Sequence, residues 1–281
     1  KTSIGTIPSS TVMTSLVREN AFSSSPEFRP TLRPLRILHL TDLHFGGGVP
    51  AGYYDRAIQT IQETLIDPYR PEFTAITGDF LDHDEWRRAM VVPLRRLAES
   101  PVREGVWFVL GNHDFRLKRT DADTLRRTLV EECGFHDLGG RIRTFRCGDG
   151  PEVTLIGDES PWGRTPPESM CEDIVPADHR WTFVLTHTPD RFPVWADRSD
   201  TEVDLVLAGH THGGQMCVPG IGAILTPCVS GTTFSDGVFL RNGTFLHVGR
   251  GLAAQNPLRL FCPPEAVLLE LRSTGSDHIH P

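Results

Sequence analysis

Short apolar runs alternate with amphipathic stretches along most of the chain. Five runs have the length and composition of buried strands, and they cover residues 35–40, 73–77, 106–110, 181–185 and 203–208. Between the early runs, apolar residues recur at helical spacing in 53–65, 86–99 and 123–132, although Pro93 is expected to kink or shorten the second helix. This alternation predicts βαβ units around a buried sheet.

Shorter apolar runs dominate the C-terminal half. They predict further β-strands at residues 142–147, 153–157, 223–227, 237–240, 244–248 and 266–271. Helices concentrated early and strands continuing later favour two packed sheets with helices outside. Residues 1–34 are rich in Ser, Thr and Pro and lack periodicity, so we expect an extended N-terminal arm or linker there, a folded domain at 35–272 and a tail at 273–281.

Composition narrows the class of protein. The chain has 281 residues, of which 38% are hydrophobic and 23% charged, as expected for a globular core. A formal charge of −8 argues against a nucleic-acid partner, since binding phosphates needs a basic surface. No apolar run approaches the ~20 residues of a membrane helix, so we expect no transmembrane segment in this chain. We expect a cytoplasmic or membrane-associated protein, and the sequence does not decide between these compartments. Six cysteines without a C-x-x-C pair favour free thiols over disulfides.

Polar residues of the kinds that bind metals directly follow each of the five strong strand runs. They are Asp42 and His44 after the first, Asp79 after the second, Asn112, His113 and Asp114 after the third, His187 after the fourth, and His210 and His212 after the fifth. In α/β sheets, ligands gather at the carboxyl ends of strands. Residues i and i+2 of extended backbone point to one side, so each D-x-H or H-x-H pair is expected to face one centre.

The residue types also match metal binding. Mixed imidazole and carboxylate ligands suit iron, manganese or zinc, whereas an all-oxygen cage suggests magnesium or calcium. Asp79 is the candidate to bridge two cations with its two oxygens. Glycines before Asp79, Asn112 and His210 allow tight turns and close backbone approach. Each motif alone also fits an ordinary turn, cap or core histidine, but all five in this order favour a metal site.

These motifs resemble those of the calcineurin-like metallophosphoesterases. The pattern of that family is D-x-H, GD, GNH(D/E), H and GHxH, and every piece stands here in order between residues 42 and 212. The resemblance covers about residues 35–271 and implies an α/β fold, a four-layer α/β/β/α sandwich of two mixed β-sheets flanked by helices. Residues 209–215 read GHTHGGQ, which is similar to a group of bacterial phosphodiesterases. Some relatives of that group hydrolyse UDP-2,3-diacylglucosamine.

The resemblance also implies a role for each site residue. One metal ion would be held by Asp42, His44, Asp79 and His212, and the second by Asp79, Asn112, His187 and His210. His113 would face the phosphate and protonate or polarise the leaving oxygen, with Asp114 orienting His113. The hypothesis is a phosphodiesterase in which a hydroxide bridging two divalent or mixed-valence ions, Mn, Fe or Zn, attacks phosphorus.

Two other functions are compatible with the sequence. One is a UDP-2,3-diacylglucosamine-type pyrophosphatase of lipid A synthesis. The other is a noncatalytic scaffold of the same fold, which is expected to lack several ligands, and none is missing here. Expected partners are a phosphate ester, nucleotide- or lipid-linked, and a peripheral membrane contact. The natural substrate, the preference for monoester or diester, the metal pair and the oligomeric state are left open.

Two segments near the motifs are candidates for substrate contact. Tyr53 or Tyr54, after a glycine-rich loop, is placed to stack on a base or sugar, although a plain helix-entry loop is an equal interpretation. Residues 161–164 precede a polar, Pro-containing stretch to His179, which forms either a lid over the phosphate, with Arg164 pairing with the phosphate, or an irregular surface excursion.

Overall fold

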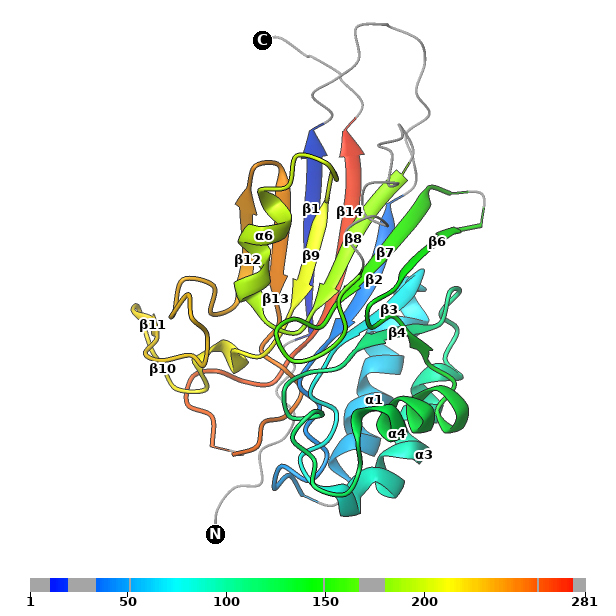
Figure 1. The fold of residues 1–281 in the computed structure, drawn as a ribbon, viewed down its shortest axis with the longest axis vertical. Helices are drawn as coiled ribbons and strands as arrows, with labels where there is room; N and C mark the ends of the chain where they lie inside the picture. Colours follow the sequence, from blue (N-terminus) through cyan, green and yellow to red (C-terminus); the bar gives the residue numbers. More distant parts are fainter. Residues whose placement is uncertain are drawn as a thin grey trace, which may run out of the picture.

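Two six-stranded mixed sheets pack against each other (Figure 1). The computed structural model describes residues 11–19, 34–50, 52–148, 150–166, 180–256 and 258–274. The first sheet has the order β1 (Thr11–Glu19), β14 (Ala266–Thr274), β2 (Leu35–Leu40), β3 (Phe73–Thr77), β4 (Val106–Val109) and β5 (His136–Asp137). The second has the order β12 (Gly237–Arg241), β13 (Thr244–Val248), β9 (Leu205–Ala208), β8 (Arg180–Thr186), β7 (Glu152–Asp158) and β6 (Ile142–Arg146).

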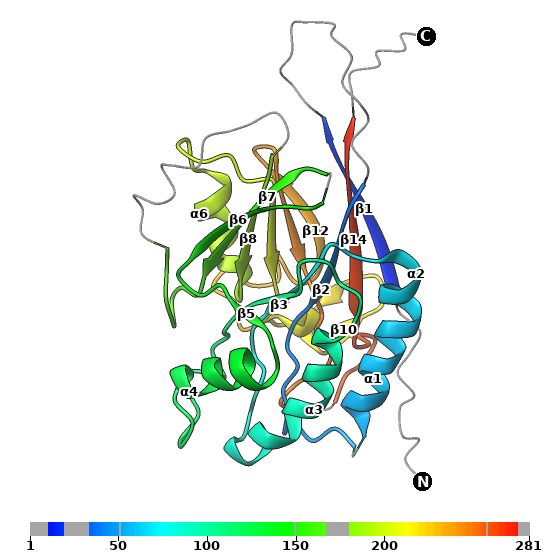
Figure 2. The same ribbon diagram turned by 90° about the vertical axis from the view of Figure 1, so that its right-hand side faces the viewer.

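Three apolar clusters divide the fold into four layers. The first lies between the first sheet and the helices α1 (Tyr53–Ile61), α3 (Arg87–Ala98) and α4 (Ala122–Arg127) (Figure 2). The second lies between the two sheets, and the third packs α6 (Phe192–Ala196) on the second sheet. In β2, Ile37 belongs to the cluster between the sheets and Leu38 to the helix-facing cluster. Both faces are buried, which explains the continuous apolar runs and confirms the predicted α/β/β/α sandwich.

The predicted helices form, with irregular turns at their ends. α1 continues through a π-helical segment, Gln62–Ile66, into the short α2 (Asp67–Tyr69). α3 retains Pro93 within it. α4 begins after Asp121, whose carboxylate accepts the backbone N–H of Thr124 at 2.6 Å, and it also runs into a π-helical segment, Thr128–Glu132. The short 3₁₀ segments are Asp84–Trp86, Pro189–Arg191 and His212–Gly214.

The strand predictions hold except in one place. The predicted strand at 223–227 is wrong, because only Gly222–Ala223 is a strand, β11, paired with β10 (Cys217–Val218) in a separate hairpin. Pro227 has no N–H with which to extend that pairing. The sequence predicted neither β5 nor β1, which lies inside the expected arm and pairs in parallel with β14. Residues 1–10, 20–33 and 275–281 of the expected arm and tail lie outside the described residues.

Strand direction decides where the polar segments meet. β2, β3 and β4 are parallel neighbours in the first sheet, and β8 and β9 are parallel neighbours in the second. Their carboxyl ends therefore lie at one edge of each sheet, and β3 also contacts β8 and β9 across the interface. Within the described part of the chain, no helix is long and apolar enough to cross a membrane, and the five described cysteines have free thiols.

Candidate metal centre

The loops after β2, β3, β4, β8 and β9 bring seven polar side chains into one buried region. They are Asp42, His44, Asp79, Asn112, His187, His210 and His212, the complete set of predicted metal ligands. Six of them are buried, and His212 retains only 13% side-chain exposure. Their distances divide them into two clusters that share one aspartate. That these residues bind metal ions remains a prediction.

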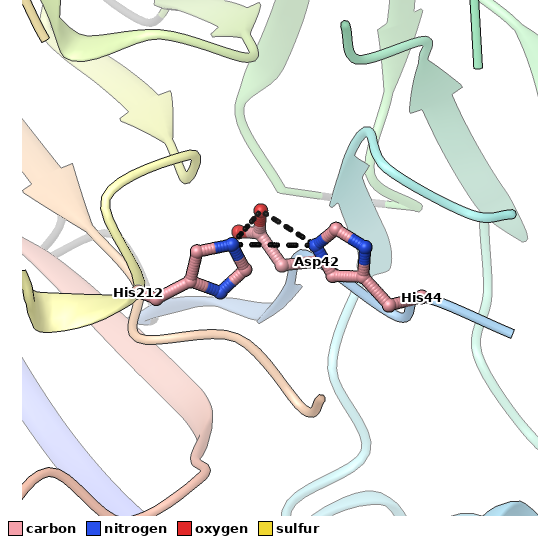
Figure 3. A group of neighbouring side chains, drawn as sticks. All are labelled: Asp42, His44 and His212. Carbon is pink, nitrogen blue, oxygen red and sulfur yellow. Dashed lines mark hydrogen bonds and ion pairs between the residues drawn. The ribbon is translucent and has the colours of Figure 1, made fainter. Parts of the chain in front are cut away.

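The first cluster contains Asp42, His44 and His212 (Figure 3). The Nε2 atoms of the two imidazoles lie 3.3 Å apart. The Asp42 Oδ1 atom lies 3.7 Å from His44 Nε2 and 3.6 Å from His212 Nε2. Figure 3 shows the carboxylate and the two rings pointing toward one another from two segments, the loop after β2 and the loop after β9.

The second cluster surrounds the Nε2 atom of His187. This nitrogen lies 3.3 Å from Asp79 Oδ2, 3.1 Å from His210 Nδ1 and 3.0 Å from Asn112 Oδ1. The amide, the carboxylate and the two imidazoles therefore present four donor atoms around a common point.

Asp79 joins the two clusters. Its Oδ2 atom lies 3.6 Å from His44 Nε2 in the first cluster and 3.3 Å from His187 Nε2 in the second. Its Oδ1 atom accepts the backbone N–H of His113 at 2.8 Å. One carboxylate oxygen thus faces both clusters, where the sequence suggested that each of the two oxygens would face one.

The donor atoms fit two cations. Ligand atoms about 2.0–2.2 Å from one cation lie roughly 3.0–3.5 Å from their neighbours in octahedral or tetrahedral geometry. The separations within the clusters run from 3.0 to 3.7 Å. In each cluster two imidazole nitrogens face each other beside a carboxylate. One metal ion can bind all three of these groups, whereas a single hydrogen bond joins only two of them.

The backbone turns sharply at five of the candidate ligands. Asp42, His44, Asp79, His210 and His212 have φ angles between 46° and 70°. The expectation that each i, i+2 pair converges through extended backbone is therefore wrong, because left-handed turns aim these side chains. This conformation costs a residue other than glycine roughly 1–2 kcal/mol, and such strain concentrates at functional sites.

Two glycines permit the close approach of the loops. A Cβ atom on Gly111 would lie 2.3 Å from Asp79 Oδ1, and one on Gly209 would lie 1.9 Å from Thr41 Oγ1 and 2.4 Å from Asp42 Oδ2. No side chain fits at either position, which explains the glycines noted before Asn112 and His210 in the sequence.

Burial and charge set the protonation of the clusters. Burial lowers the pKa of His210 and of His212 to about 4 each, so both are neutral and able to bind metal at neutral pH. For Asp42 and Asp79 the neighbouring imidazoles outweigh burial and hold the pKa below its usual range. Both carboxylates are therefore charged.

The other two imidazoles respond to the same carboxylates. Burial lowers the pKa of His44, but the neighbouring carboxylates of Asp42, Asp82 and Asp79 outweigh it and raise the value to about 10. Asp79 likewise outweighs burial and raises the pKa of His187 to about 9. A cation that binds here must displace these protons, so its affinity will increase with pH.

Neighbouring groups fix the orientation of the candidate ligands. Nδ1 of His187 lies 2.7 Å from the carbonyl oxygen of Thr77, and Nδ1 of His44 lies 2.9 Å from Asp82 Oδ1. In both rings Nδ1–H can donate, which leaves Nε2 free to bind a metal ion.

Asp82, which the sequence analysis did not single out, lies beside His113. Its Oδ1 atom lies 2.7 Å from His113 Nδ1, and its carboxyl group is fully buried, while His113 is 22% exposed. The hydrogen bonds from His113 and His44 outweigh burial and lower the pKa of Asp82 to about 2. The signal in the sequence was its position three residues after Asp79, in the loop that follows β3.

Asp114 makes other contacts than expected. Its Oδ1 atom accepts the backbone N–H groups of Phe80 and Leu81 at 2.9 and 3.1 Å, and its Oδ2 atom accepts that of Gly111 at 2.9 Å. Asp114 therefore fixes the loop after β3 against the loop after β4. Of these two aspartates, Asp82 is the one that contacts the His113 ring.

The candidate substrate residues have structural partners. The hydroxyl of Tyr53 donates to the carbonyl of Leu252, and that of Tyr54 donates to the carbonyls of Leu43 and His44. Both tyrosines are buried, so neither is available to stack on a base or sugar.

The predicted lid is described only in part. Arg164 pairs with Asp123 and lies 3.7 Å from Asp137, so its charge is already matched. Trp162 lies closer to the site, with its ring centroid 5.2 Å from that of His210. Residues 167–179 of this segment lie outside the described residues.

Comparisons with known proteins agree with this geometry. Residues 35–214 match the calcineurin-like phosphoesterases. The chain belongs to this family. YaeI of Escherichia coli, a phosphodiesterase, is 29% identical over 249 residues, which cover 87% of this chain and 84% of that protein. YkuE of Bacillus subtilis, an uncharacterized metallophosphoesterase, is 28% identical over 244 residues, which cover 85% of this chain and 80% of that protein.

A solved structure agrees on the fold of this family member. The sulfate thiohydrolase SoxB of Thermus thermophilus matches with a TM-score of 0.51 and 13% identity, covering 87% of this chain and 58% of that one. The match supports the two-sheet sandwich alone. The chain is thus a metallophosphoesterase with three overlapping His/Asp groups that could hold a metal ion, the third of which consists of His44, Asp79 and His113.

Proposed function

We propose that this metallophosphoesterase is a phosphodiesterase that uses two metal ions. The observation that carries the proposal is the position of Asp79 Oδ2, within 3.6 Å of an imidazole nitrogen in each cluster. Asp42, His44, Asp79 and His212 would hold one ion, and Asp79, Asn112, His187 and His210 the other. When bound, the ions supply charge stabilisation for phosphoryl oxygens and lower the pKa of water.

His113 is the residue that we assign to the leaving group. Asp82 holds its Nδ1 atom at 2.7 Å, so Nε2 is left to face the phosphoester. From that position Nε2 donates a proton or hydrogen bond to the leaving oxygen. Asp82 positions the ring, the task first assigned to Asp114, while Asp114 holds the two loops together through backbone N–H groups.

The proposal of a phosphodiester as the substrate rests on the similarity to YaeI and can be tested directly. YaeI, a relative over 84% of its own length, is a phosphodiesterase. The purified protein, stripped with a chelator, is assayed on bis-p-nitrophenyl phosphate and on p-nitrophenyl phosphate with added Mn²⁺, Zn²⁺ or Fe²⁺. We expect metal-dependent turnover that is faster on the diester.

A matched variant separates the chemistry from metal binding. His113→Ala is expected to keep the metal content of the wild type and to slow diester turnover about 10²-fold, the scale of one acid–base group. Turnover that persists in the stripped protein, or a preference for the monoester, contradicts the proposal. Loss of metal in His113→Ala would show that its role is assigned wrongly.

A further inference from the structure

An uncharged hairpin continues from the loop that carries His210 and His212. β10 and β11 pair at Cys217↔Ala223 and Val218↔Gly222, and Figure 1 shows the hairpin projecting at the edge of the molecule. No Asp, Glu, Lys or Arg occurs from residue 213 to residue 235, although 23% of the chain is charged. Solvated loops normally carry charge, so the composition indicates an apolar contact.

The apolar side chains of this hairpin face outward. Ile221 at its tip is 79% exposed, and Leu225 is 76% exposed. A second segment adds Phe261, which is 67% exposed. We call the exposed apolar residues of these two segments the apolar lip; they are Ile221, Ile224, Leu225, Leu258, Leu260 and Phe261. Contiguous exposed apolar surface of this kind marks a binding site.

Backbone hydrogen bonds join the two segments into one surface. The N–H of Cys217 donates to the carbonyl of Leu260 at 2.9 Å, and the N–H of Leu260 donates to the carbonyl of Gln215 at 2.9 Å. Arg259, the one charged residue between the apolar side chains, turns inward. Its guanidinium donates to the carbonyls of Arg250 and Ala253 at 2.8 and 2.5 Å.

We propose that the apolar lip inserts into the surface of a lipid bilayer. Its side chains are aliphatic apart from one phenylalanine, and it presents no Tyr, Trp or outward Arg, the residues that anchor protein interfaces. A surface without charged side chains suits insertion among acyl chains, because burying a charge there is costly. With a net charge of −8, the chain is not drawn to anionic lipids, so burial of apolar surface drives the contact.

The lip is continuous with the metal centre. Cys217, the first residue of β10, follows His212 by five residues, so at about 3.6 Å per residue the hairpin begins within roughly 18 Å of His212. The thiol of Cys262, next to Phe261, donates to the carbonyl of His212 at 3.0 Å. Docking therefore holds the candidate metal centre at the membrane surface, where phosphoesters of lipid headgroups lie.

The experiment is cosedimentation of the full chain with vesicles of phosphatidylcholine, with and without phosphatidylglycerol. The test variant carries Ile221→Ser, Ile224→Ser and Leu225→Ser. The matched control carries Val92→Ser, Val130→Ser and Val194→Ser, three exposed apolar residues away from the lip. Asp79→Asn serves as a second control, because docking does not depend on the proposed activity.

We expect the wild type, the valine control and Asp79→Asn to bind both vesicles alike, with little effect of salt. The lip variant is expected to lose at least about tenfold in partitioning, since each aliphatic side chain contributes a sizeable share of the insertion. No sedimentation of the wild type, or an equal loss in the valine control, overturns the proposal. The proposal is also overturned if the wild type is a dimer and the lip variant, alone among the variants, is a monomer. A second copy of the chain would then cover this surface.

Discussion

Replacing Asp82 by Asn tests how His113 is held. Asp82 Oδ1 lies 2.7 Å from His113 Nδ1 and 2.9 Å from His44 Nδ1, and its carboxyl group is fully buried. A hydrogen bond to a charged group contributes about 1 kcal/mol more than a neutral one, so the amide weakens each contact by about that amount. At saturating metal, we predict a fall of roughly fivefold to tenfold in kcat on bis-p-nitrophenyl phosphate.

The contact with His44 predicts a second effect of the same substitution. Because Asp82 also orients a candidate metal ligand, apparent metal affinity should fall about tenfold or more. Titrating metal while measuring kcat separates the two effects. Asp114→Asn is the control, since its amide would face backbone N–H donors. That variant should lose about 1–3 kcal/mol of unfolding free energy and keep a larger share of kcat.

A double variant decides whether Asp82 acts through His113. In the His113→Ala background, Asp82→Asn should cause no further fall in kcat at saturating metal, because the ring that it positions is gone. An additive fall refutes the reasoning. The reasoning is also refuted if Asp82→Asn has the kcat of the wild type and Asp114→Asn is as slow as His113→Ala.

Two further predictions concern pH and packing. Burial lowers the pKa of His247 from 6.5 in the unfolded chain to about 4 in the folded protein. Below pH 6.5 the unfolded chain therefore binds a proton that the folded protein does not, and the free energy of unfolding falls. The loss reaches about 3 kcal/mol at pH 4, and His247→Gln should remove it from urea unfolding curves of the chelated protein. Gly209→Ala places a Cβ 1.9 Å from Thr41 Oγ1 and should abolish metal binding at the first cluster, as measured by calorimetry. Gly220→Ala has nothing within 4 Å of its Cβ and strains only its own turn, where φ is +83°, so it should retain metal binding.

The sequence predicted the sheets well because the central strands are buried on both faces. β2 and β3 occupy the predicted ranges, since a strand that packs on helices and on a second sheet is apolar throughout. β5 has two residues, too few for a pattern. β1 lies in a segment without apolar periodicity, and among the described strands it pairs with β14, a long-range contact that local sequence does not encode.

The candidate site was predictable in its residues but not in its geometry. Polar residues at strand ends identified the members of the candidate site, because parallel strands end at one edge. Their division into two groups came from the family resemblance. The left-handed turns at Asp42 and His44 have no local signal, since tertiary packing imposes them. The resemblance assigned Asp114 to His113, and the sequence did not single out Asp82, because which turn reaches the ring depends on how two loops pack.

Metal stoichiometry tests the central claim most directly. The protein, reconstituted with Mn²⁺ or Zn²⁺ and freed of excess ion, is analysed by inductively coupled plasma mass spectrometry beside Asp79→Asn. A shared Asp79 predicts two ions per chain in the wild type and, in the variant, loss of both metal and diester turnover. Wild-type metal content together with wild-type turnover in Asp79→Asn would contradict the account.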